Sequence, residues 1–304
     1  MNNENPLSGI FLPLVTPFIK EKIDLKYLQQ NIQKYNQTNT NGYMILGGNG
    51  EYLGLTEKEA LRVVDTVVRV KANNKTAVVG TGRESAYATV EFIKRVAAVG
   101  AEFASIITPF YYAKLMNGDA LVRYYLRIAD ESPIPVIVYN SPEYAAGVKV
   151  SVQGIAELSH HPNIAGMKNS SNESMKNYIG CLAEESRFVI HVGRILRLFD
   201  GLQEGAVGAT LAIANYLPEL CSEAYYSFRT GDQAKSKAIC EQLTRINQFI
   251  SPHGVPGVKC AMDWAGFHGC ETRLPLLPLS REKRMQIREI LFDEGLIKSS
   301  TDYQ

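Results

Sequence analysis

The 304-residue sequence lacks long hydrophobic runs and lacks an excess of charge of either sign. No apolar stretch approaches the roughly 18 residues that a membrane-spanning helix needs, and the first residues have neither the basic start nor the apolar core of a signal peptide. The 32 Lys and Arg residues are balanced by 31 Asp and Glu residues, and no short basic run marks a nucleic-acid or lipid surface. We therefore expect a cytoplasmic protein that binds neither membranes nor nucleic acid.

Cysteine and histidine are too few and too scattered for a metal site or a disulfide framework. The five cysteines are odd in number and lack CxxC spacing, so we expect free thiols. The five histidines lack ligand spacing, and His191, on a predicted strand, is expected to be a hydrogen-bonded residue of the fold. The glycine-rich segment 80–85 lacks the third glycine of the dinucleotide fingerprint. The sequence predicts no metal and no organic cofactor.

Short apolar runs alternate with amphipathic stretches along the first two-thirds of the chain, which indicates alternating strands and helices. Thr56-Glu57-Lys58-Glu59 has the form of a capping box and predicts a helix that runs to about Lys71, while Asp24 is a suitable N-cap for a helix at 24–37. The predicted strands are 10–15, 43–46, 76–79, 103–107, 136–139, 164–168, 188–192 and 206–212.

Eight such strand–helix units within one chain favour a closed (β/α)8 barrel, the TIM barrel, whose chemistry lies on loops at the carboxyl ends of the strands. An open doubly wound sheet is the alternative, but it usually carries a phosphate loop. From about residue 218 the pattern is helical throughout. We therefore predict a barrel domain at 1–217 and a C-terminal helical extension at 218–304.

Lys168 ends the predicted buried strand at 164–168, where a charge is unexpected. A buried lysine can lose its proton, and the neutral amine can then attack a ketone to form a Schiff base. The alternative is a lysine whose amino group reaches solvent. Tyr139 ends the preceding strand, and adjacent strands lie about 4.8 Å apart, so its hydroxyl is a candidate proton shuttle for Lys168 or a wall of the barrel mouth.

Two further strand-end loops carry candidate ligand-binding groups. Gly48-Asn49-Gly50-Glu51 follows the second predicted strand, and its backbone N–H groups are suited to an anion such as a carboxylate. Tyr111 and Tyr112 follow the fourth strand, where paired tyrosines serve either packing and interfaces or catalysis.

Four motifs in this order resemble the dihydrodipicolinate synthase and N-acetylneuraminate lyase superfamily over nearly the whole chain. They are Gly-Gly-Asn-Gly-Glu at 47–51, Thr-Pro-Phe-Tyr-Tyr at 108–112, Tyr-Asn-x-Pro at 139–142 and Gly-x-Lys at 166–168.

The resemblance implies class I chemistry on a 2-oxo acid, usually pyruvate, without a metal. Lys168 matches the imine-forming lysine and Tyr139 the proton-transferring tyrosine. Gly48 and Asn49 occupy the pair that binds the pyruvate carboxylate, although the family commonly has two hydroxyl residues there. Tyr111 matches a tyrosine that reaches into a neighbouring subunit's site, and the implied assembly is a homotetramer, a dimer of dimers.

Two departures from the family pattern bear on the substrate. Tyr144 stands where lysine-pathway synthases have an arginine for the aldehyde's carboxylate, which weakens the synthase interpretation. Gly193-Arg194-Ile195-Leu196 lacks the carboxylates with which sialic acid lyases bind a polyhydroxyl tail. Arg194 is instead a candidate partner for a second substrate carboxylate, or a solvent-facing residue at a helix start.

Several stretches, among them 166–170, 211–215 and 254–259, resemble the 4-hydroxy-2-oxoglutarate aldolase branch, which cleaves a dicarboxylic 2-oxo acid to pyruvate and glyoxylate. Ser170 and Ile213 are then candidate substrate-binding residues. Three alternatives stay open: a 2-keto-3-deoxy sugar acid aldolase or dehydratase, a 4-hydroxy-tetrahydrodipicolinate synthase, and a non-catalytic protein that only binds 2-oxo acids or other proteins.

Overall fold

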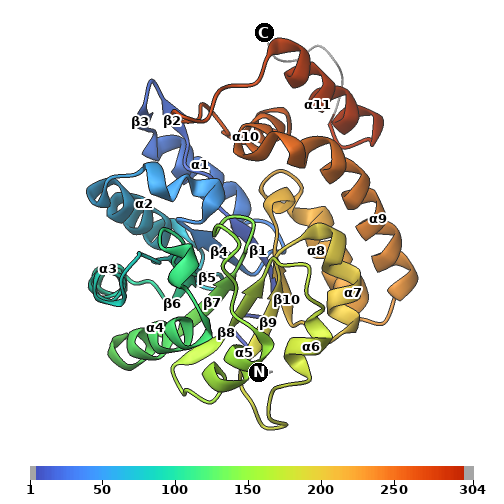
Figure 1. Cartoon of the computed structure of the whole chain (residues 1–304). Helices are drawn as coiled ribbons and strands as arrows, with labels where there is room; N and C mark the ends of the chain where they lie inside the picture. Colours follow the sequence, from blue (N-terminus) through green and yellow to red (C-terminus); the bar gives the residue numbers. More distant parts are fainter. Residues whose placement is uncertain (1–4, 298–304) are drawn as a thin grey trace. The chain divides into compact units, whose positions relative to one another are not determined.

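A computed structural model describes residues 5–297 and shows a closed barrel of eight parallel strands (Figure 1). The order around the barrel is β1-β10-β9-β8-β7-β6-β5-β4, so neighbours in sequence are neighbours in space. The predicted (β/α)8 fold is therefore confirmed. The strands are β1 (Gly9–Pro13), β4 (Gly42–Ile45), β5 (Thr76–Gly80), β6 (Phe103–Ile107), β7 (Val136–Asn140), β8 (Ile164–Asn169), β9 (Val189–Val192) and β10 (Gly208–Thr210).

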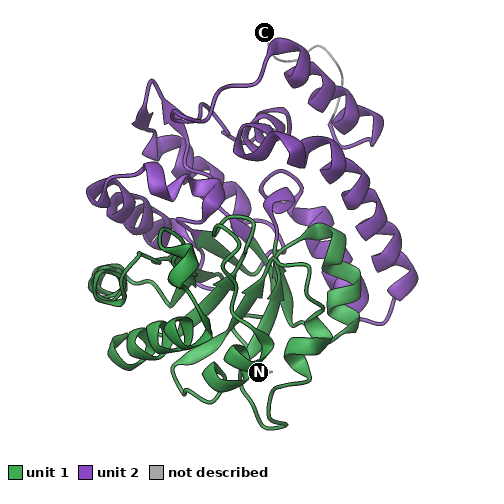
Figure 2. Ribbon diagram, in the orientation of Figure 1, with its two compact units in different colours: residues 1–11, 41–44, 74–210 green, residues 12–40, 45–73, 211–304 purple. Residues whose placement is uncertain are grey.

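The contacts of the chain group it into two compact units (Figure 2). Unit 1 takes the described residues up to 11, then 41–44 and 74–210, and so carries the barrel strands apart from the ends of β1 and β4. Its helices, which flank those strands, are α3 (Ala86–Ala98), α4 (Gly118–Glu131), α5 (Val152–Leu158), α6 (Met175–Ile179) and α7 (Leu198–Gln203).

Unit 2 takes residues 12–40, 45–73 and the described part of the chain from 211 onward. It therefore joins the C-terminal helices to two early stretches of sequence, and the predicted domain boundary after residue 217 stays a prediction. The helices of unit 2 are α1 (Leu25–Tyr35), α2 (Glu57–Val70), α8 (Pro218–Arg229), α9 (Gln233–Ile250), α10 (Gly254–Trp264) and α11 (Arg281–Asp293). None of the helices within 5–297 is long and apolar enough to cross a membrane.

The helices begin where the sequence supplies capping side chains. The Asp24 carboxylate accepts from the backbone N–H of Tyr27, and the capping box of Thr56 and Glu59 is formed at the start of α2. Each cap satisfies backbone N–H groups that a helix cannot satisfy internally. Both predicted N-termini are confirmed.

Part of the barrel interior is apolar. Leu7, Phe11, Val78 and Ile137 form a buried cluster there. Gly166 lets β8 approach β9, because a Cβ at this position would lie 2.3 Å from the Val189 carbonyl oxygen. Such close packing fixes the positions of the barrel strands.

Short elements were not predicted. Strands β2 (Phe18–Ile19) and β3 (Lys22–Ile23) form a two-stranded sheet whose turn residues Lys20 and Glu21 have positive φ angles of 48° and 65°. Two-residue strands show no periodicity in sequence. Two 3-10 turns, η1 (Gly48–Gly50) and η2 (Tyr52–Gly54), follow β4 and precede α2.

Candidate active site

Lys168 lies near the carboxyl end of β8 and is 7% exposed, so its amino group does not reach solvent. Its Nζ atom is 3.7 Å from the Met44 sulfur and 4.2 Å from the centre of the Tyr139 ring. Lys168 and Tyr139 are direct register partners on β8 and β7. The expectation of a buried lysine beside a tyrosine on the next strand is met by this geometry.

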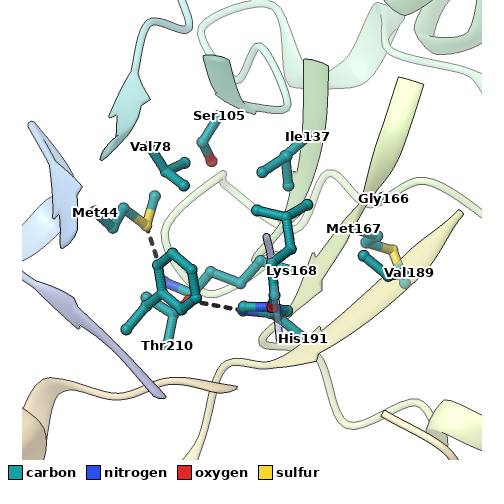
Figure 3. A pocket seen from close by; sticks show the side chains of 12 residues that line it. Met44, Val78, Ser105, Ile137, Gly166, Met167, Lys168, Val189, His191 and Thr210 are labelled. Carbon is teal, nitrogen blue, oxygen red and sulfur yellow. Dashed lines mark hydrogen bonds between the residues drawn. The ribbon is translucent and has the colours of Figure 1, made fainter. Parts of the chain in front are cut away.

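A small cavity of about 20 Å³ adjoins Lys168 inside the barrel (Figure 3). Its wall combines apolar side chains with three polar ones, Ser105, His191 and Thr210. The Ser105 hydroxyl is buried and has no hydrogen-bond partner in the described part of the chain. A space of this size holds about one water molecule, so the lysine has little solvent on this side.

The surroundings of Tyr139 lower the pKa of its hydroxyl. Burial raises the pKa of the Tyr139 hydroxyl, but the charge of Lys168 and the hydroxyls of Ser141 and Ser170 lower it, and the lowering effects dominate. A tyrosine with a lowered pKa exchanges protons more readily near neutral pH. The predicted role of Tyr139 as a proton shuttle stays a prediction.

Ser141 is a site residue that sequence reasoning missed. It is buried one residue past β7, and its hydroxyl is one of the two that lower the pKa of Tyr139. The neighbouring Asn140 side chain binds Val150 and Tyr178 and so fixes the loop that carries Ser141. Ser141 occupies the unspecified position of the motif Tyr-Asn-x-Pro at 139–142, so the motif pointed to the tyrosine and not to the serine.

Ser170 follows β8, and its backbone N–H donates to the Asn140 carbonyl at 2.8 Å. Gly193 packs against it so closely that a Cβ there would lie 1.9 Å from the Ser170 hydroxyl oxygen. The glycine thus makes room for the hydroxyl beside Tyr139. The predicted place of Ser170 among the substrate-binding residues stays a prediction.

His191 on β9 is the register partner of Lys168 on its other side. Its Nδ1 atom lies 3.2 Å from the Thr210 hydroxyl, and Nε2 pairs with the Leu7 carbonyl oxygen. The pKa of His191 is lowered to about 4, mainly by burial and to a lesser extent by the charge of Lys168, against the opposing effect of the Leu7 carbonyl. The prediction of a hydrogen-bonded barrel histidine is confirmed, and the ring is neutral at pH 7.

Arg194, just past β9, pairs with the Glu143 carboxylate and donates to the Asn172 amide oxygen at 3.1 Å. Glu143 and Asn172 follow β7 and β8, so three neighbouring strand ends contribute to this cluster. Tyr144 lies within electrostatic reach of Tyr139, Glu143 and Arg194. The sequence suggested no carboxylate next to Arg194, because Glu143 lies 51 positions away.

Tyr111 lies in the loop after β6 and is 75% exposed, with its ring against that of Tyr112. The Glu84 carboxylate accepts from the backbone N–H groups of Phe110 and Tyr111 and fixes the loop. Its predicted role in a neighbouring subunit's site stays a prediction.

The remaining predicted site residues lie in unit 2. Gly48 and Asn49 begin turn η1, so their N–H groups precede its first internal hydrogen bond, from Gly50 to Gly47. Ile213 is buried in another 3-10 turn, η5 (Ala212–Asn215). The predicted roles of these three residues in substrate binding stay predictions.

The described residues contain no cluster of metal-binding side chains. Within 5–297, no group of three or more His, Cys, Asp or Glu side chains is placed to hold a metal ion. All five cysteines are free thiols, as the sequence predicted.

The motifs and the barrel agree with a match over almost the full chain. The family model described as Dihydrodipicolinate synthetase family matches residues 6–293. The chain belongs to the dihydrodipicolinate synthetase family. A 4-hydroxy-tetrahydrodipicolinate synthase from Thermodesulfovibrio yellowstonii is 30% identical over 300 residues, which cover 95% of this chain and 99% of that one. A protein of Emericella nidulans named "Probable 4-hydroxy-2-oxoglutarate aldolase, mitochondrial" is 27% identical, with 97% of each chain covered.

A solved structure agrees with this membership in the dihydrodipicolinate synthetase family. The dihydrodipicolinate synthase of Acinetobacter baumannii, complexed with pyruvate, superposes with a TM-score of 0.89 at 26% identity and covers 96% of this chain and 100% of its own. The predicted family resemblance is thereby confirmed, and the family is one of aldolases and lyases.

Proposed function

We propose that this protein is a class I lyase that forms a Schiff base between Lys168 and a short 2-oxo acid, with pyruvate as product or donor. The observation that carries the proposal is the buried Lys168 amino group, 4.2 Å from the ring of Tyr139, whose pKa it lowers. A protein that only binds 2-oxo acids has no need of a buried amine beside an acidic phenol.

In the proposed reaction, the neutral Lys168 amine attacks the ketone carbon of the 2-oxo acid and the resulting carbinolamine loses water to give a protonated imine. The imine accepts the electron pair of the breaking C3–C4 bond, which yields an enamine and an aldehyde. Tyr139 takes the proton from the C4 hydroxyl during cleavage and returns it to C3 of the enamine. Hydrolysis of the imine then releases pyruvate and restores the amine.

The carboxylate of the 2-oxo acid is assigned to Gly48 and Asn49 by the family resemblance. Fixing that group would hold the ketone carbon in place and raise the rate of imine formation by positioning. Ser141, with its buried hydroxyl beside Tyr139, is an additional candidate for a hydrogen bond to the substrate.

The preferred substrate under this proposal is 4-hydroxy-2-oxoglutarate, whose second carboxylate would bind Arg194. The pair of Arg194 with Glu143 does not prevent this, because the two side chains are 35% and 60% exposed and exposed pairs contribute only about 0–1 kcal/mol. A planar guanidinium can bind the substrate carboxylate through two hydrogen bonds and exchange Glu143 for it.

A second candidate is a 2-keto-3-deoxy sugar acid, and one observation favours it. Glu143 neutralises Arg194, and the carboxylate and the Asn172 amide offer acceptors and donors that suit hydroxyl groups. A 4-hydroxy-tetrahydrodipicolinate synthase activity is disfavoured, since Tyr144 replaces the arginine expected for it.

The test of the mechanism is borohydride trapping with pyruvate, followed by peptide mass spectrometry. Wild type should gain a stable adduct on Lys168, and Lys168→Ala should gain none. Lys259 is a built-in control, because it is also a buried lysine with a pKa lowered by burial, against the opposing effect of Glu51. An adduct on Lys259, or none on wild type, would refute the proposal.

The substrate is tested by the rate of pyruvate release from 4-hydroxy-2-oxoglutarate and from 2-keto-3-deoxygluconate. Arg194→Met should raise KM for the dicarboxylic acid at least tenfold, the equivalent of about 1.4 kcal/mol, and leave the sugar acid less affected. Faster cleavage of the sugar acid by wild type, together with a loss of that activity in Glu143→Gln, would reject 4-hydroxy-2-oxoglutarate as the substrate in favour of the sugar acid.

The assembly expected from the family resemblance is a homotetramer, which the exposed side chains of the Tyr111 loop support. The cytoplasmic location expected from the sequence stays a prediction, as does the absence of membrane and nucleic-acid partners.

A further inference from the structure

A second buried charge cluster lies entirely within unit 2 and takes no part in the proposed chemistry. At its centre are Lys259 on α10 and Glu51 at the end of turn η1, with side chains 1% and 4% exposed and 2.6 Å between Nζ and Oε1. The segment 254–259 resembled the family, but neither the barrel nor the proposed reaction gives this lysine a role.

The Lys259 ammonium group has three oxygen neighbours. Besides Glu51, the group donates to the Thr16 carbonyl at 2.7 Å and to the Glu271 carbonyl at 2.6 Å. The ring of Phe18 lies 4.6 Å from the same nitrogen. The ion pair and the two hydrogen bonds together fix the position of the charge.

Glu51 is held equally firmly. Its second carboxylate oxygen accepts from the backbone N–H of Arg273 at 2.9 Å. Its own backbone is left-handed, with φ of 53°, a conformation that is unfavourable for a residue other than glycine. The buried carboxylate contacts explain how this conformation is kept, and they hold the C-terminal end of the loop 47–51.

A third tie acts on the same loop. The Thr16 hydroxyl donates to the Gly50 carbonyl at 2.8 Å, so that Thr16 contacts both the loop and, through its own carbonyl, Lys259. The loop 47–51 is therefore connected to α10 through Glu51 and through Thr16.

A buried ion pair is weak evidence for a gain in stability, since a protein with a well-packed apolar pair in its place is often as stable or more stable. What an ion pair with fixed partners supplies is a defined geometry. We infer that Glu51 and Lys259 are a positioning pair, which sets the conformation of the loop 47–51 and through it the affinity for the carboxylate of the 2-oxo acid. The inference rests on the proposed function, in which that loop binds the carboxylate.

The test compares KM and kcat for the 2-oxo acid in Glu51→Gln, Lys259→Met and the double variant, with thermal unfolding of each. Because the pair acts on binding, KM should rise at least tenfold while kcat changes less than threefold. The double variant should regain thermal stability, since no unpaired charge stays buried, but it should not regain KM. Lys94→Met, which removes one partner of the exposed Lys94–Glu91 pair, is the matched control and should leave KM unchanged.

Thr16→Val keeps the shape of the side chain and removes only the hydroxyl bond to the loop, so it provides a variant that folds if the charge variants do not. It should raise KM severalfold with kcat retained. Wild-type KM in Thr16→Val, or in a folded double variant, would overturn the inference.

Failure of the proposed function is detected separately, by the absence of a borohydride adduct in wild type. An adduct in wild type with unchanged KM in the variants would leave the mechanism intact and reject only the positioning pair.

Discussion

At the level of single residues, the proton chemistry of the site depends on what surrounds Tyr139. Three groups lower the pKa of its hydroxyl against the effect of burial: the Lys168 ammonium and the hydroxyls of Ser141 and Ser170. Of these, only Lys168 would form a bond to the substrate. The two serines can therefore be changed without removing the nucleophile.

Ser141→Ala should raise the pKa of Tyr139, because it removes a hydrogen bond to the phenolate. The limb of the pH profile of kcat/KM that belongs to Tyr139 should move to higher pH, and activity near neutrality should fall. Ser222→Ala, which removes a buried hydroxyl bonded within helix α8, should leave the profile unchanged. An unshifted profile in Ser141→Ala would mean that its hydroxyl does not act on Tyr139.

Sequence predicted the residues of the site unevenly, and the reason is physical. Lys168 and Tyr139 were predicted to lie together because parallel strands place their ends at one edge and side chains follow the strand register. Glu143 and Asn172 were not predicted to meet Arg194, since they lie 51 and 22 positions from it on loops whose paths no periodicity encodes. Single polar residues in such loops carry no pattern that indicates their partner.

At the level of elements, β9 contributes a group whose protonation opposes folding. His191 is buried between Phe11, Thr210 and Leu7, next to the charge of Lys168. Its pKa falls from 6.5 to about 4 in the folded chain. Between these values the unfolded chain binds the proton and the folded chain does not.

The free energy of unfolding should therefore include a contribution from His191 that is complete above pH 6.5 and is lost as the pH falls towards 4. The contribution is roughly 3 kcal/mol for a shift of this size. Urea unfolding at a series of pH values measures it. His191→Gln keeps a donor for the Leu7 carbonyl but does not titrate in this range. The free energy of unfolding should therefore change less with pH between 6.5 and 4 in this variant than in wild type. An equal change would mean that other groups cause the pH dependence.

The regular elements were the best predicted part of the structure. Strand β6 (Phe103–Ile107) was predicted to the residue, and the capping box of Thr56 gave the start of α2, because caps and short apolar runs are local properties. The strand predicted at 206–212 is confined to Gly208–Thr210. Beyond Thr210 the apolar run continues into a buried 3-10 turn. An apolar run alone does not distinguish a buried strand from a buried turn.

At the level of the whole molecule, the Tyr111 loop presents apolar side chains to the outside of unit 1. Tyr111, Tyr112 and Leu115 are 75%, 59% and 69% exposed. Exposed aromatic clusters of this kind are typical of interfaces.

We expect light scattering to give a particle of four 33.7 kDa chains. Tyr111→Ala should lower kcat or weaken the assembly, while Tyr87→Ala, which also removes an exposed tyrosine of unit 1, should do neither. A fully active monomer would contradict the predicted assembly.

Unit 2 joins residues 12–40 and 45–73 to the C-terminal helices, so we expect those helices to be necessary for folding. Within unit 2, Asn31 on α1 exchanges two hydrogen bonds with His268, and the Tyr35 hydroxyl donates to the Asn215 carbonyl. A chain cut after residue 217, at the boundary predicted from sequence, would keep the first partners and lose His268, Lys259 and Arg273. We expect residues 1–217 alone to fail to unfold cooperatively in urea; a cooperative transition would support the predicted barrel domain.

Because unit 2 combines early and late segments of the chain, it cannot be completed until synthesis on the ribosome is nearly finished. Helix α1 emerges early, with Leu28 and Ile32 on a face that is buried in the finished protein, while Asn31 must wait for His268. At typical rates of translation this delay is on the order of ten seconds or more. For that time the apolar face of a nascent helix is exposed, which makes the early part of unit 2 a natural client for a chaperone and the stretch most prone to aggregate during fast heterologous expression.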